Sequence, residues 1–276
     1  MPCIIHTLTP AGLQPADYTA ESLADAARHE PRTGVYTITN TFESIKVLRL
    51  DAHLDRLEDS ARRSGIPLTL DRPRLRAALR QMIDDSGFGN VRFRITVPAD
   101  APSSLILSIE PFHGVAPALY EQGVHLQTTH AAARDNPAAK TTAWMHDRAA
   151  LDAQRPAGIY EMLLTDADGT LLEGTSSNFY AVLDGELRTA GDGVLAGIAQ
   201  QIVFEIAPPL LPVRREAVRI DAIPRFSEAF ITSSSRGIVP VVRIDGIVIG
   251  PGTPGTHTRA LRTAYADWMR THLETL

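Results

Sequence analysis

Only two of the 27 basic residues in this chain are lysines, Lys46 and Lys140. Arginine supplies surface charge as well as lysine does, but only a desolvated lysine amine loses its proton readily and forms Schiff bases with carbonyl groups. Each lysine is therefore a candidate nucleophile. Lys140 ends the run Asn136-Pro137-Ala138-Ala139-Lys140, and 33 residues later comes a run of small and polar residues that begins with Glu173. This pair is the strongest chemical signal in the sequence.

Composition excludes several other classes of function. Net charge is −5 without a long run of one sign, so we expect neither nucleic acid nor an anionic membrane as a partner. No apolar run approaches the roughly 18–20 residues that span a bilayer, and the N-terminus lacks the pattern of a signal peptide, which predicts a cytoplasmic location. Cys3 is the single cysteine and the nine histidines lack ligand spacing, so we predict no metal site.

Patterns of strands and helices divide the chain into two α+β halves. The first half has β-prone or apolar runs at 35–39, 45–50, 91–97 and 105–109, and helical periodicity after Asp51 up to Gly65 and over 73–85. Asp51 is the expected N-cap of the first of these helices. A Pro- and Gly-containing stretch at 111–117 is the best linker candidate, and it predicts domains at 1–115 and 116–276.

The second half contains two hairpin patterns with Asp-Gly turns, at 161–173 and 179–189. Further strands are expected at 123–129, 229–232 and 239–244, and helices at 142–154, from about 198 to 207, and at 257–273. The second predicted helix follows Gly197, so its free backbone N–H groups and its dipole could hold a phosphate.

Five landmarks in this order resemble the class IV aminotransferase family, the fold-type-IV pyridoxal-phosphate enzymes. They are 34–36, 53–57, Lys140, 173–179, and 195–198 taken together with 232–235 and 238–241. The resemblance implies an α+β fold of two domains, a small N-terminal α/β domain and a larger C-terminal pseudo-barrel domain. It also implies pyridoxal 5'-phosphate as the cofactor, amino acids and 2-oxo acids as substrates, and a homodimer.

The resemblance assigns roles to individual residues. Lys140 is the expected catalytic residue, forming the Schiff base and moving the substrate Cα proton, and Glu173 is expected to keep the pyridine nitrogen protonated. The residues expected to bind the cofactor are Arg56, Lys140, Glu173, Ser177, Asn178, Gly197, Ile198, Ala199, Ser234 and Ser235. The candidates for substrate binding are Tyr36, Arg92, Arg94 and Arg236. For each of these arginines a surface ion pair is an alternative of at least equal weight, and Tyr36 could instead fill the core.

An aminotransferase is the first functional hypothesis. The alternative is an aminodeoxychorismate lyase, which would use the same lysine for β-elimination of pyruvate. A third hypothesis is a module that binds the cofactor without turnover. Such a module would not need the carboxylate of Glu173, whose expected role is to make the cofactor ring an electron sink. Lys46 matches no motif and is expected on the surface. These patterns leave D and L substrates open.

Overall fold

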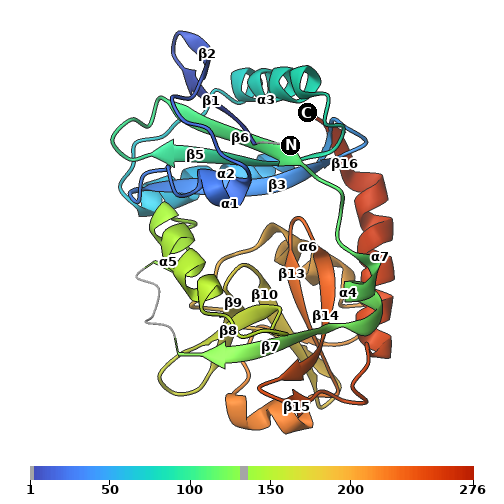
Figure 1. The fold of residues 1–276 in the computed structure, drawn as a ribbon. Helices are drawn as coiled ribbons and strands as arrows, with labels where there is room; N and C mark the ends of the chain where they lie inside the picture. The colour runs from blue at the N-terminus through green and yellow to red at the C-terminus, as the bar shows by residue number, and fades with distance from the viewer. Residues whose placement is uncertain (1–2, 131–135) are drawn as a thin grey trace. The chain divides into compact units, whose positions relative to one another are not determined.

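The computed structural model describes residues 3–130 and 136–276, and the chain in it divides into two compact units (Figure 1). The first unit comprises Met1–His113, Ala139–Asp147 and His272–Leu276, and the second comprises Gly114–Ala138 and Arg148–Thr271. The two units are thus discontinuous in sequence, whereas the sequence suggested two continuous halves. Each unit combines helices with a sheet, and the predicted α+β class is confirmed.

A seven-stranded sheet forms the centre of the first unit, and each neighbouring pair of its strands is antiparallel. The strands in sheet order are β16 (Leu273–Thr275), β4 (Lys46–Leu48), β3 (Gly34–Phe42), β5 (Val91–Pro98), β6 (Leu105–Pro111), β1 (Ile4–Thr9) and β2 (Gly12–Pro15). The predicted hairpin is present as β3 and β4, but β3 pairs along most of its length with β5. No sequence pattern had indicated the C-terminal strand β16.

Two long helices, α2 (Leu50–Arg63) and α3 (Arg72–Ser86), share one apolar core with the sheet, and the short helix α1 (Leu23–Ala26) belongs to a separate small cluster. The core side of α2 follows helical spacing, with Leu50, Leu54 and Leu57 almost fully buried. This spacing was visible in the sequence for Leu54 and Leu57, and the face that it defines packs into the core that α2 shares with the sheet.

The predicted N-cap of α2 is wrong. Helix α2 begins two residues earlier than predicted, at Leu50, after Arg49 in a left-handed conformation (φ 50°) with no capping side chain of its own. The Leu50 N–H group instead donates to Glu274 Oε1 at 2.8 Å. A carboxylate from the C-terminal strand therefore caps the helix in place of Asp51, which lies in the first helical turn.

A closed barrel of six strands forms the centre of the second unit. The pairings run β10–β13–β14–β7–β8–β9, and β9 pairs with β10 to complete the ring. The barrel strands are β7 (Val124–Thr129), β8 (Glu161–Thr165), β9 (Leu171–Gly174), β10 (Asn178–Leu183), β13 (Glu228–Ser233) and β14 (Gly237–Ile244). Three short strands outside the ring are β11 (Glu186–Arg188), β12 (Val213–Arg214) and β15 (Ile247–Val248). Both hairpins predicted from Asp-Gly turns are confirmed.

Helical elements complete the chain. They are α4 (Pro117–Gln122), α5 (Thr142–Ala153), α6 (Ile198–Ile206), the 3-10 helix η1 (Ile220–Arg225) and α7 (Thr256–His272). The predicted helices at 142–154, 198–207 and 257–273 are confirmed within a residue or two. Among the described residues no helix combines the length and the apolar character needed to cross a membrane.

The barrel core predicts a test with two leucines of the second unit. Leu163 on β8 is completely buried in this core, whereas Leu210 is 39% exposed. We expect Leu163→Ala to lower the free energy of unfolding by about 2–5 kcal/mol, because it leaves a cavity among packed side chains. Leu210→Ala should change it by less than about 1 kcal/mol. Denaturant unfolding measures both, and equal losses would contradict the assigned core.

Candidate active site

The backbone of Lys140 is held on both sides within the first unit. Its carbonyl oxygen accepts a hydrogen bond of 2.9 Å from the Tyr36 N–H group, and its own N–H group donates to Ser60 Oγ at 3.1 Å. Thr141 next to it forms a β-bridge with Val35. The side-chain Nζ lies 4.7 Å from the centre of the Tyr36 ring, and Tyr36 itself is 2% exposed. The lysine amine is therefore carried by a fixed backbone and lies against a buried aromatic face.

One face of α2 supplies polar groups at helical spacing. His53, Arg56 and Ser60 are separated by three and four residues, so they follow one another along the helix side that meets β3. Thr37 on β3 lies between the first two: its Oγ1 is 3.0 Å from His53 Nδ1 and 3.4 Å from Arg56 Nη2. Arg56, the predicted phosphate ligand, thus belongs to a chain of polar groups whose other end is a buried histidine.

His53 is completely buried, and it is held neutral. Burial is the main cause that keeps its pKa well below the ordinary 6.5, and the positive charges of Arg56 and Lys140 act in the same direction. Arg56 donates to Thr37 Oγ1, and the same hydroxyl lies within hydrogen-bond distance of His53 Nδ1, so this chain of polar groups uses Nδ1 of the ring and not Nε2. That Nε2 atom has no hydrogen-bond partner among the described residues.

In the second unit, Glu173 is the residue at which the barrel closes. Its position on β9 pairs with Asn178 on β10. Both side chains bind the main chain of Leu195: Glu173 Oε2 accepts from its N–H group at 3.1 Å, and Asn178 Nδ2 donates to its carbonyl oxygen at 2.8 Å. Glu173 is only 4% exposed. The carboxylate is therefore buried and fixed close to the chain that leads into α6.

Gly197 is the N-cap of α6 and has no side chain with which to cap the helix. A Cβ atom at this position would collide with Asn178 Oδ1, so the close approach of the two segments requires glycine. The main-chain N–H groups of the first turn, which includes the buried Ile198 and Ala199, have no partners within the helix. This arrangement offers free donors and a helix dipole to an anion.

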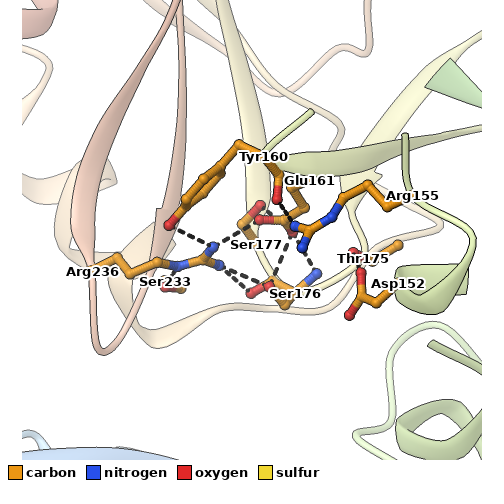
Figure 2. Close-up of polar contacts among 9 residues, drawn as sticks. All are labelled: Asp152, Arg155, Tyr160, Glu161, Thr175, Ser176, Ser177, Ser233 and Arg236. Atoms are coloured by element: carbon orange, nitrogen blue, oxygen red, sulfur yellow. Dashed lines mark hydrogen bonds and ion pairs between the residues drawn. The ribbon is translucent and has the colours of Figure 1, made fainter. Parts of the chain in front are cut away.

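The predicted serines lie in two loops of the second unit. Ser234 and Ser235 are half-buried in the turn between β13 and β14. Ser177 is nearly buried, and its hydroxyl donates to Glu161 Oε1 at 2.9 Å (Figure 2). Ser177 therefore bonds to the protein interior through its hydroxyl.

The three candidate arginines for substrate binding differ in their surroundings. Arg94 is 3% exposed and forms an ion pair with the buried Glu30, with Nε 3.0 Å from Oε1. Arg236 also forms an ion pair, with Glu161. The side chain of Arg92 is 41% exposed and its Nη1 lies 3.9 Å from Glu110 Oε1. The geometry of Arg94 and Arg236 thus favours ion pairs over free guanidinium groups, but these pairs are buried or nearly so and do not lie on the surface as expected.

The sequence patterns did not single out the residues that support these groups, among them Thr37, Ser60 and Glu161. Each is a single polar residue in a stretch without a recognisable motif. Each forms a hydrogen bond with a partner between 15 and 80 residues away in the sequence. The spacing of His53, Arg56 and Ser60 on one helix face was the available signal. The described residues place no three His, Cys, Asp or Glu side chains together as metal ligands.

The neutral His53 predicts how stability depends on pH. Below about pH 6.5 the unfolded chain takes up a proton on this histidine and the folded chain does not, so the free energy of unfolding falls as pH decreases. The slope from this one group approaches about 1.4 kcal/mol per pH unit. His53→Gln should remove that part of the slope between pH 7 and 5.5, as measured by urea unfolding, and replacing the exposed His113 by Gln should leave it unchanged. Identical slopes in all three proteins would contradict the assignment.

The sequence matches a known protein family over most of its length. Residues 34–244 match the family described as amino-transferase class IV. The branched-chain-amino-acid aminotransferase of Escherichia coli (strain K12) is 25% identical over 270 residues, which is 87% of this chain and 87% of that protein. The D-alanine aminotransferase of Bacillus licheniformis is 27% identical over 258 residues, which is 84% of this chain and 86% of that protein.

The fold agrees as well. The crystal structure of the T.th. branched-chain amino acid aminotransferase, complexed with N-(5'-phosphopyridoxyl)-L-glutamate, superposes with a TM-score of 0.81. It is 22% identical in sequence, and the alignment covers 99% of this chain and 98% of that one. The fold is therefore shared from end to end, and the family match covers well over half of the sequence. The chain belongs to the class IV aminotransferase family and is a transaminase of that class.

Proposed function

We propose that this protein transfers an amino group between an amino acid and a 2-oxo acid with Lys140 as its catalytic residue. The observation that carries the proposal is the arrangement of Lys140, whose main chain is bonded on both sides while its amine lies on the Tyr36 ring. A lysine held in this way can present its amine repeatedly to the same reacting carbon. The relatives are named as aminotransferases, which favours this activity over a lyase.

The cofactor is pyridoxal phosphate, the group on which this family depends. When bound, it supplies an aldehyde that takes up the amino group and a pyridine ring that accepts electrons from the substrate Cα. The residues of this chain fit such a group. Glu173 offers a buried carboxylate, and the glycine at position 197 leaves open the N-terminus of α6. A polar, negatively charged cofactor needs both a counter-ion for its ring and donors for its phosphate.

Donors for the phosphate come from separate parts of the chain. We assign to it the guanidinium of Arg56, the main-chain N–H groups that follow Gly197 at Ile198 and Ala199, and the turn at Ser234 and Ser235. Arginine and the free amides of a helix start are the preferred partners of a phosphate dianion. Asn178 and Ser177 serve the same site through the segment that carries Glu173, because their side chains bond to the surrounding protein.

Glu173 and Lys140 divide the movement of protons between them. A carboxylate beside the pyridine nitrogen favours its protonated form, and Glu173 is assigned to hold that proton. Lys140 is assigned to remove the proton from the substrate Cα and to deliver it to the carbon that had carried the cofactor's aldehyde oxygen, because an amine can act as base and then as acid. Burial of Tyr36 beneath the amine excludes water from that side.

The substrate is an amino acid of the branched-chain or the D class, the two classes after which the relatives are named. Arg92 and Tyr36 remain our candidates for contacts with it, since Arg92 is partly exposed and Tyr36 faces the lysine amine. Arg94 and Arg236 are weaker candidates because their guanidinium groups already bind carboxylates. Assays with L-leucine, L-valine and D-alanine as amino donors separate the two classes.

Replacing Lys140 tests the proposed chemistry directly. We expect Lys140→Ala to lower the rate of amino transfer by at least about a hundredfold, because it removes the group that moves the Cα proton. Borohydride reduction of the holoenzyme should attach the cofactor to the peptide that contains Lys140. The absorption change from the pyridoxal to the pyridoxamine form, followed after adding an amino acid, measures the half-reaction.

Lys46 is the matched control for this experiment. Its Nζ lies 2.7 Å from Glu43 Oε2 and its side chain is 42% exposed, so it forms an ordinary surface ion pair. Lys46→Ala should retain wild-type activity. Covalent trapping of the cofactor in the Lys140→Ala protein, or full turnover by it, would overturn the assignment. Release of pyruvate from aminodeoxychorismate without amino transfer would favour the lyase.

We also propose that the protein is a homodimer. The family resemblance implies this state, and a symmetric dimer is the commonest assembly among soluble oligomers. The chain mass is 30.0 kDa, so sedimentation should give a species of twice that mass. A fully active protein that sediments as a monomer at all concentrations would contradict this prediction.

A further inference from the structure

Glu161 and Arg236 form an ion pair inside the second unit (Figure 2). Glu161 is the first residue of β8, and Arg236 directly precedes β14. Arg236 Nη1 lies 2.8 Å from Glu161 Oε2, and the two side chains are 18% and 4% exposed. The contact joins positions 75 residues apart in the sequence.

Every donor of the Arg236 guanidinium has a partner in the protein. Besides the bond to Glu161, Nη1 lies 3.4 Å from the Tyr160 hydroxyl, and Nε donates to Ser233 Oγ at 2.7 Å. Nη2 donates to the carbonyl and hydroxyl oxygens of Ser176, at 3.1 and 2.9 Å. A guanidinium carries five N–H donors. None is left over for a substrate carboxylate.

The second oxygen of Glu161 holds a segment of chain. Oε1 accepts hydrogen bonds from the Ser176 N–H group at 2.6 Å, from the Ser176 hydroxyl at 3.1 Å and from the Ser177 hydroxyl at 2.9 Å. A Cβ atom at Gly174 would collide with both Glu161 Oε1 and Ser177 Oγ. The segment 174–177 is thus fitted against the carboxylate with no spare room.

Charge strengthens these contacts. Burial on its own raises the pKa of the Glu161 carboxyl, but the positive charge of Arg236 and the bonds from the segment outweigh burial, so the pKa is lowered. The carboxyl is therefore ionised at neutral pH. Hydrogen bonds to a charged group are shorter and stronger than those between neutral groups. A neutral glutamine of the same shape would hold the segment less firmly.

We propose that Arg236 and Glu161 are positioning residues that hold two cofactor-binding segments, 173–178 and 233–236, in a fixed relation to each other. The first segment carries Glu173, and the second carries Ser234 and Ser235. In this role Arg236 supports the site through its contacts with the protein and does not bind substrate. The inference rests on the proposed function, since it concerns how the same cofactor is held.

Four variants and one control test the pair in the holoenzyme. The variants are Arg236→Lys, Arg236→Met, Glu161→Gln and the double variant Arg236→Met/Glu161→Gln. The control is Arg243→Met, which removes an arginine from β14 itself. Arg243 Nη1 donates to the Gly246 carbonyl oxygen at 2.9 Å. The readouts are kcat, KM for both substrates, the visible absorption of the bound cofactor, and amide hydrogen exchange in 174–178.

We expect each single variant to lower kcat about ten- to a hundredfold, as loss of an outer hydrogen-bond partner does at metal sites. The absorption band should shift and exchange in 174–178 should accelerate, while KM changes by less than about twofold. The double variant should lose less activity than the product of the two single losses, because both changes disrupt the contact that Arg236 and Glu161 share. Arg243→Met should resemble the wild-type protein.

Two results would overturn the proposal. A large rise in KM for Arg236→Lys and Arg236→Met, with Glu161→Gln unaffected, would make Arg236 a substrate ligand. A fall in melting temperature with unchanged kcat and unchanged absorption would make the pair merely structural. Failure of the wild-type protein to take up pyridoxal phosphate would instead overturn the proposed function. Hydrogen exchange in the cofactor-free protein would then still decide whether the pair holds the segment.

Discussion

The barrel of the second unit closes where β9 meets β10, and these strands meet at one pair of residues, Glu173 opposite Asn178. So short a contact needs support from side chains, and both side chains supply it by bonding to Leu195. The same bonds satisfy a carboxylate that has been removed from water, which would otherwise be costly. Closure of the barrel, burial of the acid and placement of the chain before α6 therefore depend on one another.

In the first unit, main-chain hydrogen bonds hold the segment that carries Lys140. In the proposed role the amine of Lys140 has to remain available for reaction, so it is poorly suited to anchor its own segment. Anchoring falls instead to the lysine carbonyl and N–H groups, which bond to the Tyr36 N–H group and to the Ser60 hydroxyl. The amine proposed to react is thus carried by main-chain atoms that take no part in the proposed chemistry, whereas Glu173 is fixed through one of its own carboxylate oxygens. Rigid support of this kind is what a catalytic group needs to keep its geometry.

The sequence was most informative where structure depends on neighbours along the chain. Asp-Gly turns predicted the hairpins β8–β9 and β10–β11, and helical spacing predicted α2, α3 and α7. The start of α2 was missed because its cap, Glu274, is 224 residues from Leu50. The site follows the same rule. Sequence patterns single out Lys140, but they are silent on Ser60, which holds it from 80 residues away, since a lone serine on a helix has no distinctive signature.

Buried ion pairs recur at the places where a segment has to be held at a distance from its sequence neighbours. Such pairs give little net stability, because removing two charges from water offsets most of their attraction. Apolar side chains would fill the same space at less cost. A charged pair adds directionality. The hydrogen bonds of Glu161 and Arg236 can all form only when the segments 173–178 and 233–236 lie in one arrangement. Glu30 with Arg94 meets the same description in the first unit, where the Glu30 carbonyl oxygen lies 3.0 Å from the His146 ring nitrogen, six residues beyond Lys140. The position of these pairs next to the reactive segments is thus better explained by geometry than by stability.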